Sequence, residues 1–236
     1  MKQLERGVIL SRSPYSETSL IVSVLTEFHG LQTFLFQGAK KKKGMVLFPL
    51  ALVEFTSYRR TDSTLGKMTE LNLAENLSEL PFDPVKSSIA FFIVELLQRT
   101  IKQGHAENEL VQFIWKETQW LNHSNELTNY PLWFLAQYTK FCGITPAVEA
   151  HLPTVFDVDG GKLTTVRPIH PAYFEGEYLH WMEAMLLEEK VRFLAQNMGK
   201  EARNKCMEAW IAYYHQHLQG MHELKSLEVI RTILHA

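Results

Sequence analysis

The hydrophobic pattern of this chain changes its period near residue 80, and this change constrains the fold more than any other feature. Before it, short runs of apolar and β-branched residues alternate with polar residues, which is typical of strands. After it, apolar residues recur every three or four positions, which is typical of helices. We therefore expect an α+β chain with an N-terminal β-domain, residues 1–80, and a helical domain, residues 81–236.

Five short strands are predicted in the first eighty residues. The second and third are separated only by the short turn at residues 28–30, so they form a hairpin. Five such strands with polar turns favour a small closed barrel. We predict a five-stranded OB-fold barrel, and strand number alone leaves an SH3-like barrel as the alternative. The predicted strands cover residues 7–11, 19–27, 31–38, 51–60 and 67–77.

The rest of the chain is predicted to be mainly helical. Asp83 is a favourable N-cap residue and Pro84 a favourable first residue, so the first helix is expected to begin there. A two-stranded hairpin at about residues 154–166, with its turn at Asp159-Gly160, interrupts the helices. The other predicted helices cover approximately residues 107–121, 131–143, 176–197, 200–217 and 226–235.

Composition argues against several classes of protein. No apolar run approaches the roughly 20 residues of a membrane-spanning helix. The first ten residues, MKQLERGVIL, lack the long apolar segment of a signal peptide. Cys142 and Cys206 are the only cysteines in 236 residues, which argues against a disulfide framework. We therefore expect a cytoplasmic protein that does not associate with membranes.

Motifs of enzymes and metal sites are absent from the sequence. It contains no GxSxG, P-loop, GxGxxG or HExxH motif. The histidines are scattered and there is no CxxC pair, so the close ligand spacing of a zinc site is missing. We predict no catalytic residue, no cofactor and no bound metal.

Residues 34–44, FLFQGAKKKKG, place four consecutive lysines between two glycines. Adjacent ammonium groups repel one another, and the phosphates of a nucleic acid would compensate them. A solvated loop that protects strand edges is the alternative. The position on an OB barrel favours nucleic acid, because such barrels bind single strands through their loops and one sheet face. The predicted binding residues are Lys40, Lys41, Lys42, Lys43, Arg12, Tyr15, Arg59 and Arg60.

Aromatic residues near these cations are candidates for stacking on bases. Most of them are expected to lie in the core, because a small barrel needs large side chains inside it. Tyr15 and Tyr58 are the stronger candidates for a binding role. The full set is Tyr15, Phe28, Phe34, Phe36 and Tyr58.

Several stretches together resemble the RecO family of bacterial recombination mediators. Residues 7–44, GVILSRSPYSETSLIVSVLTEFHGLQTFLFQGAKKKKG, resemble the start of that family. Residues 47–60, LFPLALVEFTSYRR, resemble its next segment, and residues 217–234, HLQGMHELKSLEVIRTIL, its closing helix. Many members carry a four-cysteine zinc module after the third helix, where this chain has Cys142 alone. We therefore predict that the hairpin is kept without zinc and that apolar packing holds it.

The resemblance implies a non-enzymatic protein that binds single- and double-stranded DNA. It implies annealing of strands coated with single-strand binding protein, and loading of RecA together with RecR. In that family the helical domain also receives the acidic, apolar C-terminal tail of single-strand binding protein, and Trp133, Tyr138 and Lys140 are candidates for its wall. Such a protein works in the cytoplasm, on the nucleoid during repair. The competing hypothesis is a protein-binding OB module with a helical adaptor and no nucleic-acid role.

Overall fold

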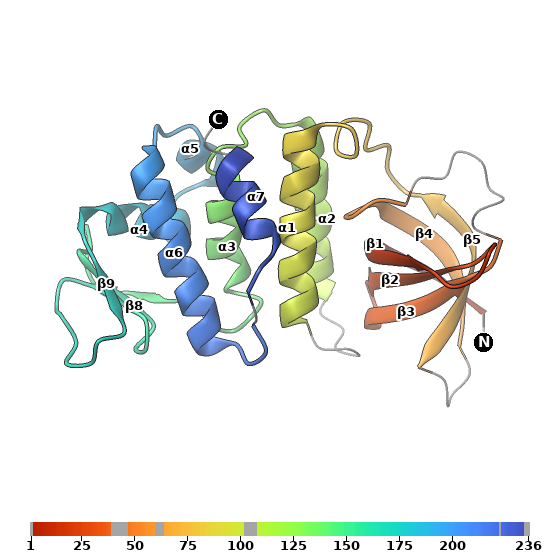
Figure 1. The fold of residues 1–236 in the computed structure, drawn as a ribbon, viewed down its shortest axis with the longest axis horizontal. Helices are drawn as coiled ribbons and strands as arrows, with labels where there is room; N and C mark the ends of the chain where they lie inside the picture. The colour runs from red at the N-terminus through yellow and green to blue at the C-terminus, as the bar shows by residue number, and fades with distance from the viewer. Residues whose placement is uncertain (1, 39–46, 60–63, 102–107, 222, 234–236) are drawn as a thin grey trace. The chain divides into compact units, whose positions relative to one another are not determined.

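The structure, a computed structural model, describes residues 2–38, 47–59, 64–101, 108–221 and 223–233 (Figure 1). The chain divides into two compact units, residues 1–124 and residues 125–236. The first unit contains a β-barrel and two helices, and the second contains further helices and a small sheet. The assignment of residues 1–80 as a separate DNA-binding domain stays a prediction.

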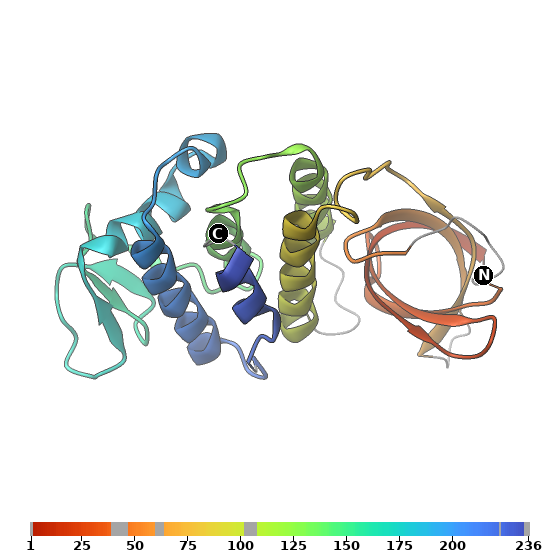
Figure 2. The same ribbon diagram turned by 45° about the horizontal axis from the view of Figure 1, so that its top comes forward.

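Five strands close into a barrel in the order β1-β2-β3-β5-β4, which Figure 2 shows as a ring. The pair β3–β5 is parallel, and the other pairs are antiparallel. This arrangement is OB-like and confirms the predicted barrel. The strands are β1 (Lys2–Pro14), β2 (Leu20–Thr26), β3 (Gly30–Phe36), β4 (Leu52–Tyr58) and β5 (Leu65–Leu73).

Strand β1 is longer than the predicted residues 7–11 because it pairs with two neighbours. Its first half pairs with β4 and its second half with β2, and Gly7 lies opposite both Thr26 and Val53. A Cβ atom at Gly7 would lie 2.6 Å from Val24 Cγ1 and 2.7 Å from the carbonyl oxygen of Leu25. Such approaches are too short for any side chain, so the crossing of β1 between its neighbours requires glycine.

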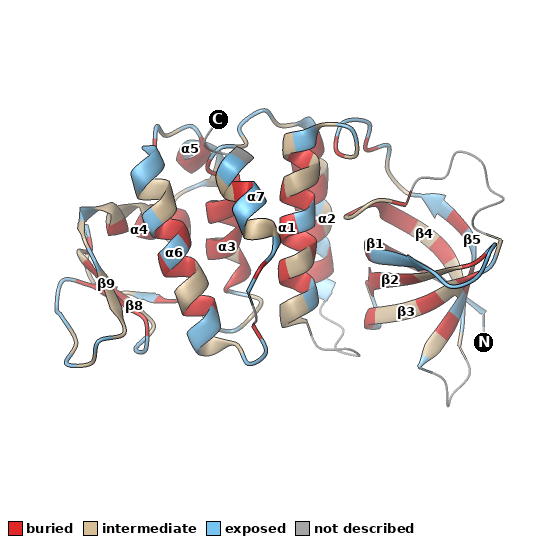
Figure 3. Cartoon of the chain, in the orientation of Figure 1, coloured by how far each residue is buried: buried red, intermediate tan, exposed pale blue. Residues whose placement is uncertain are grey.

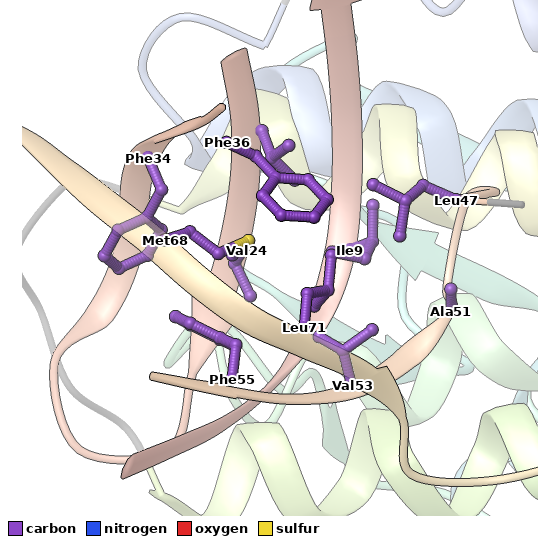
Figure 4. Packing of buried hydrophobic residues seen from close by; sticks show 11 residues of the cluster. Ile9, Val24, Phe34, Phe36, Leu47, Ala51, Val53, Phe55, Met68 and Leu71 are labelled. Carbon is purple, nitrogen blue, oxygen red and sulfur yellow. The ribbon is translucent and has the colours of Figure 1, made fainter. Parts of the chain in front are cut away.

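The inward-facing side chains of the strands fill the barrel (Figure 4). Phe34 and Phe55 meet edge to face with their ring centroids 5.1 Å apart. Complete burial of an apolar side chain of this size contributes about 1.5–3 kcal/mol relative to exposure. The cluster comprises Ile9, Val22, Val24, Phe34, Phe36, Leu47, Ala51, Val53, Phe55, Met68 and Leu71.

Two helices, α1 (Pro84–Thr100) and α2 (Asn108–His123), complete the first unit. The Asp83 carboxylate accepts hydrogen bonds from the N–H groups of Val85 and Lys86, so α1 begins where the sequence predicts. The two helices pack against each other and against β1. The barrel and this helix pair therefore form one compact unit.

A buried polar junction fixes the segment between the barrel and α1. Asn122, fully buried at the end of α2, accepts hydrogen bonds through Oδ1 from the N–H groups of Glu79 and Leu80, both at 3.0 Å. The buried Lys86 ammonium donates to the Asn122 carbonyl oxygen at 2.7 Å and to Glu79 Oε2 at 2.5 Å. Hydrogen bonds among Asn122, Lys86 and Glu79 thus connect the end of α2 to the segment that passes from strands to helices.

The second unit packs its helices around a column of aromatic rings. Tyr138, on α3, stacks with Phe134 at 5.8 Å and with Tyr214 at 6.4 Å between ring centroids. The Tyr214 hydroxyl donates to the carbonyl oxygen of Leu135 at 2.8 Å. None of the helices in the described residues is long and apolar enough to span a membrane. The helices are α3 (Tyr130–Tyr138), the 3-10 helix η2 (Glu177–Leu179), α4 (His180–Leu187), α5 (Lys190–Leu194), α6 (Lys200–His217) and α7 (Ser226–Ile233).

The continuous helix predicted at residues 176–197 is wrong, because the chain forms η2, α4 and α5 there. The backbone is extended at Glu188 and Glu189, which separate α4 from α5. After α5 the chain turns back, and the Gln196 side chain donates to the Glu188 carboxylate. Phe193 is fully buried by this turn. Tertiary packing thus overrides the helical propensity of the two glutamates.

The predicted hairpin is present as β7 (Val155–Asp157) and β8 (Lys162–Thr164), but it belongs to a larger sheet. Two further strands, β6 (Ala147–Val148) and β9 (Tyr173–Glu175), extend it to four strands in the order β6-β8-β7-β9. All four strands are too short to show an alternating pattern, and the sequence revealed β7 and β8 only because the Asp159-Gly160 turn joins them; no such turn marks β6 and β9.

Candidate nucleic-acid interface

The structure describes three of the predicted DNA-binding residues, and all three lie at loops or strand ends of the barrel. Arg12 is near the end of β1, Tyr15 begins the β1–β2 loop, and Arg59 begins the β4–β5 loop. OB barrels commonly bind nucleic acid through these two loops. The remaining predicted residues, Lys40, Lys41, Lys42, Lys43 and Arg60, lie outside the described residues.

The β1–β2 loop presents Tyr15 to solvent on a closed turn. The N–H groups of Tyr15 and Ser16 donate to the carbonyl oxygen of Ser19 at 3.0 and 3.3 Å. Ser16 Oγ in return accepts from the Ser19 N–H at 3.2 Å. Tyr15 is 62% exposed, and Arg12 on the same strand end is exposed as well. An exposed ring and a nearby guanidinium suit a nucleotide, because the ring stacks on a base while the cation binds a phosphate.

Arg59 lies over the core of the barrel and is only partly exposed. Its guanidinium carbon is 5.6 Å from the centroid of the buried Phe34 ring, which is a cation–π contact. Gly66 on β5 makes room for that ring, because a Cβ atom there would lie 2.6 Å from Phe34 Cδ1. One nitrogen of Arg59, Nη2, is shielded from solvent and has no hydrogen-bond partner among the described residues. A donor in this state favours an anionic ligand.

The sheet register relates these positions to one another. Arg12 lies opposite Val22 on β2, and Val22 lies opposite Phe34 on β3. The backbone at Arg12 is therefore two strand spacings, about 10 Å, from the backbone at Phe34, whose ring lies beneath the Arg59 guanidinium. Strand β3 ends at Phe36, opposite the first residue of β2, so the chain leaves the sheet beside the β1–β2 loop.

The outward face of β2 and β3 is uncharged at the positions where OB barrels often stack bases. Ser23 lies opposite Thr33, and Ile21 lies opposite Leu35, with all four side chains partly exposed. Phe34 and Phe36 point into the core, whereas Tyr15, Phe28 and Tyr58 are exposed, so the prediction that most of the five aromatic candidates lie in the core is wrong. Cations at the loops and a neutral face between them suit contacts with phosphates more than contacts with base edges.

Sequence reasoning did not single out two exposed lysines that the barrel places beside Tyr58. Lys2 on β1 and Lys67 on β5 are both paired with Tyr58 on β4. Tyr58 is 42% exposed. The three residues are far apart in the sequence, and only the strand register reveals that they are neighbours.

A shallow pocket in the second unit combines apolar walls with two arginines. The Nε atoms of Arg203 and Arg231 are shielded from solvent and lack a hydrogen-bond partner within the described ranges. Arg203 donates through Nη1 to the carbonyl oxygen of Met198, and Arg231 Nη2 lies 3.9 Å from Glu208 Oε1. Burial lowers the pKa of Arg203. The pocket is lined by Thr128, Leu132, Arg203, Asn204, Met207, Ile230 and Arg231.

The residues considered as a wall for an acidic tail do not form one on α3. Trp133 is 7% exposed and Tyr138 is 1% exposed, and both belong to the aromatic core. Lys140 is exposed and donates to Gln137 Oε1 at 2.7 Å. An acidic segment needs a cationic partner, which the pocket of Arg203 and Arg231 provides.

Aromatic packing and polar contacts hold the small sheet. Phe156 of β7 is fully buried, with its ring centroid 6.0 Å from that of Trp210 and 5.1 Å from that of Tyr213. The Tyr213 hydroxyl donates to the carbonyl oxygen of Ile144 at 2.6 Å, and burial raises the pKa of Tyr213 to about 12. Asp157 pairs with His170 at 3.2 Å. The hairpin thus packs directly on α6, a contact that the sequence analysis did not predict.

The absence of zinc stays a prediction. No group of three or more potential ligands was found within the described residues. Cys206 is buried, which raises the pKa of its thiol and makes it a poor thiolate ligand. Because we predict no zinc, we expect a metal chelator to leave the thermal unfolding midpoint unchanged. A structural zinc contributes strongly to folding, so its removal would lower the midpoint. Elemental analysis of the purified chain provides the control, and one zinc per chain would contradict the prediction.

Comparison with known proteins identifies relatives along the whole chain. Residues 1–77 match the family model described as Recombination protein O N terminal. DNA repair protein RecO of Bacteroides fragilis is 31% identical over 241 residues, which cover 99% of both chains. DNA repair protein RecO of Phocaeicola vulgatus is 29% identical over 239 residues, again covering 99% of both. The corresponding protein of Flavobacterium psychrophilum is 25% identical over 234 residues and 97% of both.

Proposed function

Because this chain belongs to the RecO family of DNA repair proteins, we propose that it binds single- and double-stranded DNA and anneals strands coated with single-strand binding protein. Family membership gives it a role in DNA repair and recombination. Within that role, we propose that it acts with RecR to load RecA. It works without enzymatic activity, in the cytoplasm and on the nucleoid.

The observation that carries this proposal is the placement of cations at the binding loops of an OB-like barrel. Arg59 places a donor without a described partner at the β4–β5 loop, and Arg12 and Tyr15 are exposed at the β1–β2 loop. The segment with Lys40–Lys43 follows β3 in the sequence, and β3 ends beside the β1–β2 loop. We propose that these residues together bind the phosphates of a strand.

Phosphate contacts position a strand without reading its sequence. Two strands held in this way keep their base edges free, and pairing between complementary bases then supplies the specificity. The neutral outer face of β2 and β3, with Ser23 and Thr33, supports this account because it offers no charged group to a base edge. Annealing therefore needs no catalytic side chain.

We propose that the acidic, apolar tail of single-strand binding protein docks in the pocket of Arg203 and Arg231. Leu132, Met207 and Ile230 form the apolar floor of this shallow pocket, but they are at most 4% exposed, so the arginines provide the main contact. The two guanidinium groups supply charge for its carboxylates, with Nε donors that have no partner in the described part of the chain. A tail bound there would bring coated strands to the barrel.

Annealing of complementary oligonucleotides precoated with single-strand binding protein tests the proposal. We expect the chain to accelerate formation of the labelled duplex by at least about tenfold, since it holds both strands close together. Arg231→Ala is expected to reduce this acceleration on coated strands and to leave annealing of naked strands unchanged. A single-strand binding protein without its tail serves as the matched control.

Failure to anneal naked strands would contradict the proposed function, whereas failure on coated strands alone would contradict only the tail pocket. A protein-binding adaptor is the second candidate. A cavity of about 290 Å³ in the first unit favours it, because Arg6 lies 4.5 Å above the Trp115 ring there, beside Lys116. An adaptor would use such a cavity for a peptide and would bind no oligonucleotide.

A further inference from the structure

The outer face of β1, β4 and β5 carries an aromatic ring between two cations. Lys2 and Lys67 are the direct cross-strand partners of Tyr58, one on each side. All three residues are exposed, while Ser57 and Met68, next to them along the strands, are buried. Figure 3 shows buried and exposed positions following one another along the barrel strands. Since side chains alternate between the two faces of a strand, Lys2, Tyr58 and Lys67 share the outer face. We call this row the Tyr58 platform.

The charge of the Tyr58 platform is not neutralised within the described residues. Neither Lys2 nor Lys67 forms an ion pair there. The nearby carboxylates lie further along the face: Glu54 pairs with Arg6 at 3.1 Å, and Glu70 accepts a hydrogen bond from a threonine hydroxyl at 2.6 Å. The platform is therefore the cationic end of this face.

The cationic end adjoins the β4–β5 loop. Tyr58 is the last residue of β4, and Arg59 follows it directly. Leu4 lies beside the row on β1 and is 71% exposed, which adds an apolar contact surface. The ring, the aliphatic side chain and the two ammonium groups match the parts of a nucleotide in a flexible strand: a flat base, a sugar and phosphates on both sides.

We propose that the Tyr58 platform binds one unpaired base, with Lys2 and Lys67 on the flanking phosphates, and that it gives the chain a preference for single-stranded over double-stranded nucleic acid. Both faces of a base in a duplex are covered by its neighbours, so only an unpaired base can stack on Tyr58. The loop cations bind phosphates of either form, and the platform discriminates between them. This inference rests on the proposed DNA binding and adds the form of DNA that is preferred.

Wild-type protein provides the first test, with three labelled ligands of equal length: an oligothymidylate, the same backbone with abasic sites, and a duplex. Stacking of one base corresponds to a change in affinity of about 5- to 150-fold. We expect the oligothymidylate to bind more tightly than the abasic strand by a factor in this range. Equal affinity for these two strands would overturn the platform, and binding to none of the ligands would overturn the proposed function itself.

Variants provide the second test. Tyr58→Ala is expected to remove most of the preference for thymidylate over abasic strands and to leave duplex affinity within about twofold, whereas Tyr58→Phe keeps the ring and the preference. Phe91→Ala is the matched control and is expected to keep the preference, because Phe91 is 56% exposed on α1, outside the barrel strands. A preference that survives in Tyr58→Ala would assign stacking to another residue and overturn the proposal.

The lysines are tested separately by the salt dependence of binding. The slope of log K against log salt is negative. Lys2→Gln and Lys67→Gln are each expected to reduce its magnitude by about 0.7 on the single strand. Slopes that stay at the wild-type value would show that neither lysine contacts a phosphate. Thermal unfolding of each variant shows whether it is folded. If Tyr58→Ala does not fold, the wild-type comparison of thymidylate with abasic strands still decides the proposal.

Discussion

Replacing Lys40, Lys41, Lys42 and Lys43 together by alanine is expected to weaken binding to single-stranded DNA on the order of 100-fold at low salt. Each lysine that neutralises a phosphate releases counterions, and the entropy of that release favours binding. The magnitude of the negative slope of log K against log salt is expected to decrease by up to about 3 on a single strand, since each phosphate contact accounts for about 0.7. Anisotropy titrations of a labelled oligonucleotide at several salt concentrations measure both quantities.

A control variant separates a local effect from the change in net charge. Lys140, Lys162, Lys200 and Lys205 also total four positive charges, and all lie in residues 125–236. Their replacement by alanine is expected to change affinity by less than about twofold, because the proposed phosphate contacts are made by the barrel and its loops and include none of these four lysines. Equal losses in the two variants would show that the lysine segment is no specific contact.

Asn122→Ala is expected to destabilise the first unit by about 1–4 kcal/mol. The side chain accepts hydrogen bonds from the N–H groups of Glu79 and Leu80, and alanine would leave both donors without this partner. The buried Leu80 donor costs about 1–3 kcal/mol when it is unsatisfied, and the partly buried Glu79 donor costs less, because water can reach it. Such a loss is a large fraction of the 5–15 kcal/mol that typically stabilises a domain. The midpoint of urea unfolding of the full chain, followed by circular dichroism, measures it.

Two further variants identify the cause of that loss. Asn122→Asp keeps an acceptor for both N–H groups beside the Lys86 ammonium, so it is expected to lose much less stability than alanine. Gln119, on the same helix as Asn122, donates one partly buried hydrogen bond to Glu75, and Gln119→Ala is expected to cost about 1 kcal/mol or less. If Asn122→Ala behaves like Gln119→Ala, the junction contributes little and our account of it is wrong.

Local patterns in the sequence were sufficient to predict the barrel strands and the start of α1. Each strand carries its own apolar alternation, and Asp83 with Pro84 marks a helix start wherever it occurs. The length of β1 was not predictable, because residues 2–6, KQLER, look polar in isolation. They form a strand only because β4 lies beside them.

Features that depend on distant partners were not predictable from the sequence. The break at Glu188 and Glu189 follows from tertiary packing, since neither residue disfavours a helix. The role of Asn122 depends on backbone groups more than forty residues away. A local sequence pattern contains no information about contacts with residues that are distant in the sequence.

The candidate site was predictable only where its residues adjoin local turns. Arg12, Tyr15 and Arg59 were identified because they adjoin predicted turns, where OB barrels bind their ligands. Lys2 and Lys67 were missed because isolated lysines on strands are ordinary surface residues in a sequence. Strand register alone places them beside Tyr58.

Binding of the purified wild-type chain to labelled oligonucleotides of several unrelated sequences, titrated from low to high salt, tests the central claim most directly. We predict similar affinities for all sequences in dilute buffer and a steady linear fall of log K with log salt. Absence of binding in dilute buffer would contradict the claim that cations of the barrel hold phosphates, and so would an affinity that does not depend on salt.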